Sequence, residues 1–146
     1  MFCPRAAWAV VALALVAVGC GQPGGGKPAG GGQIAWLHDY EAAQAAAKQS
    51  GRPLRGEVST SWCSACKTLD ETVLSKPAVG AASRQFVPVR VDGDKRPDLV
   101  KQLAVSGYPT VVFQRADGKE LGRVRGVPPR EQDMLEEMRS AAQAAR

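Results

Sequence analysis

The chain has 146 residues, with 19 Lys and Arg against 14 Asp and Glu, and 45% of its residues are hydrophobic. This length suits one ordinary globular domain, and the composition is that of a folded chain. The net charge of +5 is modest and no long block of like charges occurs, which argues against a protein that binds nucleic acid or a membrane through a polybasic patch.

The first residues have the pattern of an export signal. Residues 6–18 form an uninterrupted apolar run behind a positively charged start. A run of this length is too short to cross a bilayer, which needs about 20 residues, but it fits the apolar region of a signal peptide. Ala17 and Gly19 place small side chains before Cys20. We therefore predict that residues 1–19 are a signal peptide and that the protein is exported.

Cys20 begins a segment with the character of a tether. Residues 15–20 resemble a bacterial lipobox, although Ala17 stands where leucine is usual. Residues 21–32 contain seven glycines, which predicts a flexible tether over residues 20–32. We expect a lipid anchor at Cys20, which places the protein in the cell envelope, facing the periplasm or extracytoplasmic space. Plain secretion is the alternative.

Residues 33–146 alternate between helical and strand patterns. Asp39 predicts the N-cap of a helix that Gly51 ends, and Pro88 predicts an irregular start to the second strand. The order predicts an α/β fold: a parallel strand–helix–strand unit, then an antiparallel hairpin, in a mixed sheet with helices on both faces. Helices are expected over residues 40–49, 63–74, 78–84, 97–104 and 130–144, and strands over residues 54–60, 87–91, 110–115 and 120–125.

Cys63 and Cys66 lie at the predicted turn from a strand into a helix. Backbone N–H groups at the start of a helix stabilise a thiolate, so this spacing favours redox chemistry. The alternative is an inert structural disulfide, which would close only a short loop and stabilise the fold little. One cysteine pair and a distant His38 do not supply the four ligands of a zinc site. We expect no metal and no other cofactor.

A family resemblance rests on motifs spread over residues 33–146. The matching residues are Trp36, Arg52-Pro53, Trp62-Cys63-Ser64-Ala65-Cys66-Lys67, Val105-Ser106-Gly107-Tyr108-Pro109-Thr110, Phe113 and Asp117-Gly118-Lys119-Glu120. This region resembles the thioredoxin superfamily. Within that superfamily it is most similar to the periplasmic C-terminal domain of the transmembrane disulfide reductase DsbD and to small exported thioredoxin-like lipoproteins. The resemblance implies a thioredoxin-like fold.

The resemblance also implies roles for individual residues. Cys63 would be the nucleophile, and Cys66 the resolving cysteine that forms a disulfide with it. Pro109 matches the family's cis-proline, and the backbone of Tyr108 would pair with an extended substrate segment. We expect Trp62 to shield the thiols and to offer substrates a stacking surface.

Glu57 lies six residues before Cys63, where the family has a buried acid. The resemblance implies that Glu57 exchanges a proton with Cys66. The alternatives are a solvated strand residue or an ion pair with Arg55. Arg55 and Gly56 interrupt a strand that is usually apolar in the family, so either Arg55 extends to an edge of the sheet or the site is unusually polar.

We therefore predict an exported thiol–disulfide oxidoreductase that exchanges disulfides with protein thiols and disulfides, more as a reductant than as an oxidant. In an oxidising compartment, a reducing role requires a membrane protein as electron donor. We expect a monomer that binds no nucleic acid. The alternative is a thioredoxin-fold binding or adaptor lipoprotein whose cysteine pair is redox-silent or regulatory.

Overall fold

A computed structural model describes residues 33–146 of the protein. The predicted signal peptide, residues 1–19, and the predicted tether, residues 20–32, lie outside the described residues, and so does Cys20. Over residues 33–146, no helix is both long enough and apolar enough to cross a membrane.

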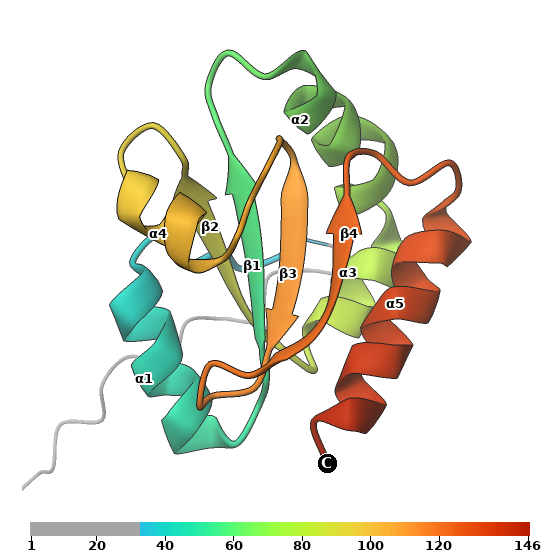
Figure 1. The fold of residues 1–146 in the computed structure, drawn as a ribbon. Coiled ribbons are helices and arrows are strands. Elements are labelled where there is room, and N and C mark those ends of the chain that lie inside the picture. Colours follow the sequence, from blue (N-terminus) through green and yellow to red (C-terminus); the bar gives the residue numbers. More distant parts are fainter. Residues whose placement is uncertain (1–32) are drawn as a thin grey trace, which may run out of the picture.

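The four strands form one mixed sheet in the order β2-β1-β3-β4 (Figure 1). The strands are β1 Leu54–Ser59, β2 Val87–Asp92, β3 Thr110–Gln114 and β4 Glu120–Arg125. β1 runs parallel to β2, whereas β3 is antiparallel to both β1 and β4. The predicted parallel unit and the C-terminal hairpin are therefore confirmed. β1, which leads to the cysteine pair, is an inner strand fixed on both sides.

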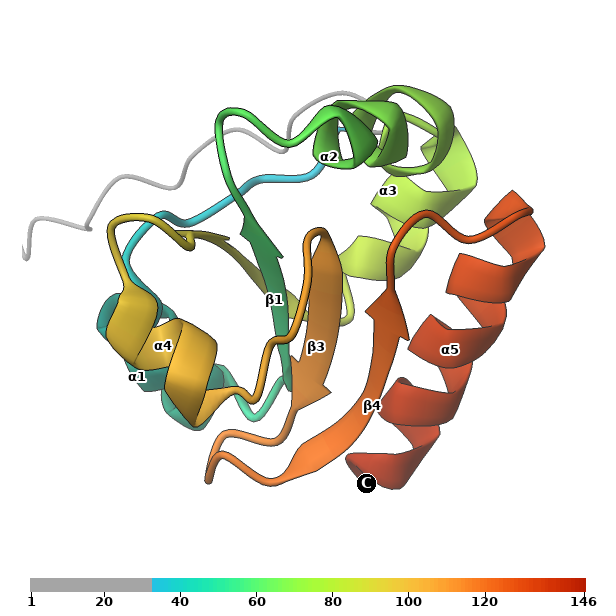
Figure 2. The ribbon, with the colours of Figure 1, turned by 45° about the horizontal axis from the view of Figure 1, so that its top comes forward.

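The helices cover both faces of this sheet, as predicted (Figure 2). They are α1 Tyr40–Ser50, α2 Ser64–Leu69, η1 Asp70–Leu74, α3 Pro77–Ser83, α4 Pro97–Gln102 and α5 Glu131–Ala144. Tyr40 of α1 and Leu99 of α4 belong to the apolar core on one face. Phe113 of β3 packs with Met134 of α5 in the core on the other face. The result is a three-layer α/β fold.

The two faces receive different side chains from β1. Leu54 and Val58 belong to the core beneath α1 and α4. Arg55 and Glu57 alternate with them and therefore point toward α2, η1 and α3 on the opposite face. Both charged side chains are completely buried, with 0% exposure. The layer under the cysteine-bearing helix thus contains a polar cluster within an otherwise apolar core.

The ends of α1 follow from local sequence. The Asp39 carboxylate accepts a hydrogen bond from the Ala42 N–H at 2.7 Å, which confirms the predicted N-cap. Gly51 adopts a left-handed conformation with φ of 70°, and its N–H donates to the Ala47 carbonyl oxygen at 2.9 Å. This conformation carries little steric cost only for glycine, which explains why the helix ends there.

Pro88 does not disturb β2. Its pairing with Arg55 is in regular register, so the predicted irregular start of this strand is wrong. The physical reason is that β2 lies at the edge of the sheet, where a missing N–H is tolerated. Outside β2, Leu37 forms a single parallel bridge with Val89 and accepts a hydrogen bond from Arg90 N–H at 2.8 Å. The chain thus enters the domain alongside this edge.

The helix predicted over residues 63–74 is interrupted. α2 ends at Leu69, and η1 continues as one π-helical turn in which the Ser75 N–H donates to the Asp70 carbonyl oxygen at 3.0 Å. A π turn accommodates one extra residue and so changes the faces that the flanking side chains present. Asp70 lies at this junction, and its side chain takes part in the site described next.

Candidate active site

Cys63 and Cys66 are joined by a disulfide at the start of α2. Cys63 is the N-cap residue, and its sulfur accepts a hydrogen bond from the Cys66 N–H at 3.1 Å. Their Cα atoms lie 5.3 Å apart, and both residues are buried. In the reduced state the same N–H would stabilise a Cys63 thiolate. This hydrogen bond therefore distinguishes the Cys63 sulfur from that of Cys66 at the start of the helix.

Two aromatic side chains lie beside the cysteine pair. Trp62 is 68% exposed and packs edge-on against Tyr108, with ring centroids 5.9 Å apart. The Tyr108–Pro109 peptide bond is cis, in agreement with the resemblance, and it leads directly into β3. A large exposed aromatic next to a disulfide offers an apolar contact surface to a partner chain.

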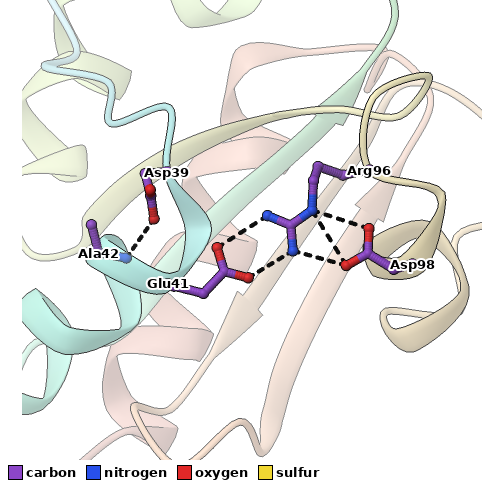
Figure 3. A network of polar contacts seen from close by, with 5 residues as sticks. All are labelled: Asp39, Glu41, Ala42, Arg96 and Asp98. Atoms are coloured by element: carbon purple, nitrogen blue, oxygen red, sulfur yellow. Dashed lines mark hydrogen bonds and ion pairs between the residues drawn. The ribbon is translucent and has the colours of Figure 1, made fainter.

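The loop between β2 and α4 holds both aromatic rings. Asp94 accepts a hydrogen bond from the Trp62 indole Nε1–H at 2.9 Å. A Cβ atom at Gly93 would lie 2.6 Å from the Tyr108 hydroxyl oxygen, so the tyrosine packs directly on this glycine. Arg96 anchors the loop by bonding both Glu41 of α1 and Asp98 of α4 (Figure 3).

We predict that Asp94→Ala slows exchange with a protein disulfide by a few-fold, up to about tenfold, the range expected for one lost hydrogen bond. The indole would lose its fixed orientation, whereas the sulfur chemistry would not change. Both exchange rates can be measured by stopped flow, and the rate with a small aromatic disulfide should therefore stay the same. Asp94→Asn, which retains an acceptor oxygen, is the matched control. Equal slowing toward both substrates would contradict this role.

Glu57 is part of a charged chain beneath the cysteine-bearing helix. Its carboxylate accepts a hydrogen bond from Arg90 Nε, and Arg90 Nη2 donates to Asp70 on η1. Both the solvated interpretation of Glu57 and its ion pair with Arg55 are therefore wrong. Burial excludes the first, and Arg90, which lies opposite Glu57 in the β1–β2 register, replaces Arg55 as partner.

The position of Arg55 decides between the two alternatives for the polar strand, an arginine that extends to the sheet edge or an unusually polar site. Arg55 does not reach the sheet edge: it is fully buried, donates to Ser83 of α3, and lies 5.3 Å from the Trp36 ring centroid. Its Nε and Nη2 atoms have no hydrogen-bond partner among the described residues. Burial lowers the pKa of Arg55 to about 10, although Glu57 opposes this shift. The interior beside the site is therefore unusually polar.

The charges around Glu57 act in opposite directions. Burial raises the pKa of Glu57 above its usual 4.5, and the nearby Asp70 carboxylate adds to the increase. Arg90 and Arg55 oppose it, but the pKa remains raised. A carboxyl group with a raised pKa suits proton exchange with a thiol better than an ordinary surface acid does.

A cleft of about 540 Å³ opens on the Cys66 side of the disulfide. Cys66 and Asp70, one helical turn apart, line it together with Arg90. The other lining residues are His38, Ser59, Thr60, Ser61, Lys67, Asp92 and Lys95. Cys66 thus shares this cleft with Arg90 and Asp70, two members of the charged chain, whereas Glu57 lies buried and does not line it.

Three residues of this site were not predicted: Arg90, Asp70 and Asp94. A signal existed for Asp70, because it follows Cys66 by four residues on the predicted helix. Arg90 is the one charged side chain in an otherwise uncharged strand sequence, Val87–Val91. Its partner could not be read from that pattern, because strand register depends on pairing across the sheet. Nothing in the sequence indicated Asp94.

Comparison with known proteins identifies the fold family. A family model described as thioredoxin-like matches residues 35–116. The chain belongs to the thioredoxin-like family. The curated relatives include the thiol:disulfide interchange protein DsbD of Klebsiella pneumoniae, 36% identical over 84 residues, which are 55% of this chain and 14% of that protein. DsbD of Cronobacter sakazakii is 36% identical over 100 residues, 64% of this chain and 17% of its own length.

Solved structures agree with this thioredoxin-like classification. A DsbH oxidoreductase matches with a TM-score of 0.69 and 23% identity, covering 84% of this chain and 93% of its own. The oxidised C-terminal domain of Neisseria meningitidis DsbD matches with a TM-score of 0.61 and 21% identity, and the match covers 73% of this chain and 99% of that domain. A Thermus thermophilus thioredoxin is 29% identical, with a TM-score of 0.66 and coverage of 73% and 85%.

The match covers less than a fifth of the length of these two DsbD proteins. The thioredoxin-like fold and the Cys63–Cys66 disulfide together are compatible with thiol–disulfide exchange.

Proposed function

We propose that this protein exchanges disulfides with exported protein substrates, and that it acts mainly as a reductant. The observation that carries the proposal is the Cys63–Cys66 disulfide, whose Cys63 sulfur accepts the Cys66 N–H at the start of α2, beside the exposed Trp62. An inert disulfide would close a loop too short to stabilise the domain appreciably. The aromatic surface beside it suits contact with a partner protein.

In the proposed reaction, the Cys63 thiolate attacks one sulfur of a substrate disulfide. The substrate S–S bond breaks, a mixed disulfide forms at Cys63, and the first substrate thiolate leaves and takes up a proton. Cys66 then loses its proton, with Glu57 as the proposed acceptor, and attacks the Cys63 sulfur. The second substrate thiol leaves with a proton. Two electrons pass to the substrate, and the Cys63–Cys66 pair becomes oxidised.

We also propose substrate contacts beside the pair. The backbone of Tyr108, next to the cis-Pro109, would pair with an extended substrate segment, and Trp62 would pack on that segment. These two residues come from opposite sides of the disulfide in sequence, but their rings are in contact. A short extended strand around the substrate cysteine is therefore the class of partner that the site favours.

The redox direction is tested by titrating the Cys63–Cys66 pair of the exported chain against defined thiol buffers. We expect a potential near that of thioredoxin, about −270 mV, which would require a dithiol membrane protein as electron donor. A value near −120 mV would instead indicate a disulfide donor and overturn the reducing direction. A pair that does not equilibrate with small thiols would favour the binding or adaptor alternative.

We further propose that residues 1–19 direct export and that Cys20 carries a lipid anchor, so that the domain of residues 33–146 is tethered in the cell envelope. The relationship to a DsbD domain supports an extracytoplasmic location. Cys20→Ala is expected to move the protein from the membrane fraction to the soluble fraction of a bacterial envelope preparation. If the wild-type chain is itself soluble there, the anchor is excluded and plain secretion remains.

A further inference from the structure

Arg90 joins carboxylates from two different elements. It pairs with the buried Glu57 of β1 and with Asp70 of η1, whose side chain is 41% exposed. The Trp36 ring lies against its guanidinium, 4.6 Å from centroid to carbon, and the same ring contacts Arg55. Arg90 is therefore fixed by two ion pairs and one aromatic face, next to a cleft that Cys66 also lines.

We propose that Arg90 is a positioning residue for the exchange reaction: it holds the Glu57 and Asp70 carboxylates together beside the Cys66 end of the cysteine pair, and so sets the pH at which Cys66 resolves the mixed disulfide. This inference rests on the proposed function. In the step concerned, the Cys66 thiol gives its proton to the Glu57 carboxylate, its sulfur bonds to Cys63, and the substrate sulfur leaves as the Cys63–substrate bond breaks.

The groups facing Glu57 determine the sign of the effect. Arg55 on β1 and Arg90 on β2 favour its charged form, whereas Asp70 on η1 disfavours it. β3 places the apolar Val111 opposite Glu57 in the register. Loss of Arg90 would leave two carboxylates near one buried guanidinium. The carboxyl group of Glu57 would then ionise only at higher pH.

The experiment uses the full chain carrying Cys3→Ser and Cys20→Ser, so that Cys63 and Cys66 are its two thiols. The reduced protein is mixed with one equivalent of dithiobis(nitrobenzoate), and the release of thionitrobenzoate is followed by stopped flow across a range of pH. The first thionitrobenzoate released reports attack by Cys63, and the second reports attack by Cys66. For Arg90→Gln, we expect the pH midpoint of the second phase to rise by about one unit, the lower end of the effect of a nearby opposite charge. The first phase should keep its rate and its pH dependence.

Arg96→Gln is the matched control. Arg96 also bridges two carboxylates, Glu41 and Asp98, but at the surface over α1 and α4 (Figure 3). Its replacement removes the same charge without touching the Glu57 cluster, so the pH midpoint of the second phase should stay at its wild-type value, even where loosening of the loop beside Trp62 changes the rates. A shift as large as that of Arg90→Gln would mean that net charge alone is responsible, and would overturn the proposal.

Two further variants separate positioning from a merely structural role. Asp70→Asn removes the repelling carboxylate and should move the second-phase midpoint to lower pH, opposite to Arg90→Gln. In a Glu57→Gln background, Arg90→Gln should produce no further shift. If the shift persists there, or if Asp70→Asn and Arg90→Gln shift in the same direction, the inference is wrong. A wild-type chain that shows no second phase would instead refute the proposed function itself.

Discussion

Replacement of Cys63 by serine is expected to lower the rate of disulfide exchange by a factor of roughly 10³ or more, as loss of a reacting nucleophile does in other enzymes. The reaction needs a sulfur at this position to form the mixed disulfide, and a serine hydroxyl does not react with disulfides. The fold should survive, because serine is a good N-cap and its oxygen would accept the Cys66 N–H as the sulfur does. Insulin reduction with a thiol donor would measure the loss.

Cys66→Ser should give the complementary result. Cys63 would still attack a substrate disulfide, but no second thiol would be available to release the product. A covalent complex should therefore accumulate, and mass spectrometry would detect one substrate chain attached at Cys63. The double variant, lacking both thiols, is the control and should capture nothing. If the Cys63→Ser protein retained its partners while wild type showed no exchange, the binding or adaptor interpretation would take precedence.

Glu57→Gln is expected to slow the Cys66 step by about 10²-fold at neutral pH, the lower end of what general acid–base catalysis contributes. Glutamine has the same shape, and its amide oxygen still accepts a hydrogen bond from Arg90, but it takes up no proton. The loss should disappear at pH values well below the pKa of Glu57, where the wild-type carboxyl group is already neutral. Attack by Cys63 on the first sulfur is the internal control.

The same variant should stabilise the folded domain at neutral pH. Burial raises the pKa of Glu57 above 4.5, so the folded state holds this proton more tightly than the unfolded state does. The resulting stability is present below the unfolded pKa and is lost as pH rises through the folded pKa. Urea unfolding should therefore show a higher free energy of unfolding for Glu57→Gln than for wild type, and this difference should be smallest near pH 4 and grow toward neutral pH. A constant difference would contradict a raised pKa.

Local patterns were sufficient where neighbours in sequence decide the structure. Asp39 predicted the start of α1 because a cap bonds an N–H three residues away, and Gly51 predicted its end because the left-handed conformation belongs to a single residue. Three alternating valines, Val87, Val89 and Val91, predicted β2 in the same way. The sequence did not predict the π turn at Asp70, because the spacing of side chains along a helix does not reveal a single inserted residue.

The cysteine pair illustrates how far sequence reaches in the candidate site. The spacing of Cys63 and Cys66 after a strand placed both at the start of a helix, and the structure joins them there. Their catalytic roles and that of Glu57 remain predictions. The cis peptide bond between Tyr108 and Pro109 was predicted from the family resemblance. The sequence by itself does not predict it, because only about 5–6% of the bonds that precede a proline are cis in folded proteins.

The sequence by itself determined the order of helices and strands and the position of the cysteine pair, because these depend on periodicity, caps and spacing along the chain. Only the tertiary structure decided where Pro88 lies in the sheet, that Arg55 is buried, and that Glu57 pairs with Arg90. Each of these depends on which strand lies at the edge of the sheet and on which residues of neighbouring strands lie opposite one another. Such pairings bring together residues that are 33 positions apart, as Glu57 and Arg90 are, and no local pattern encodes them.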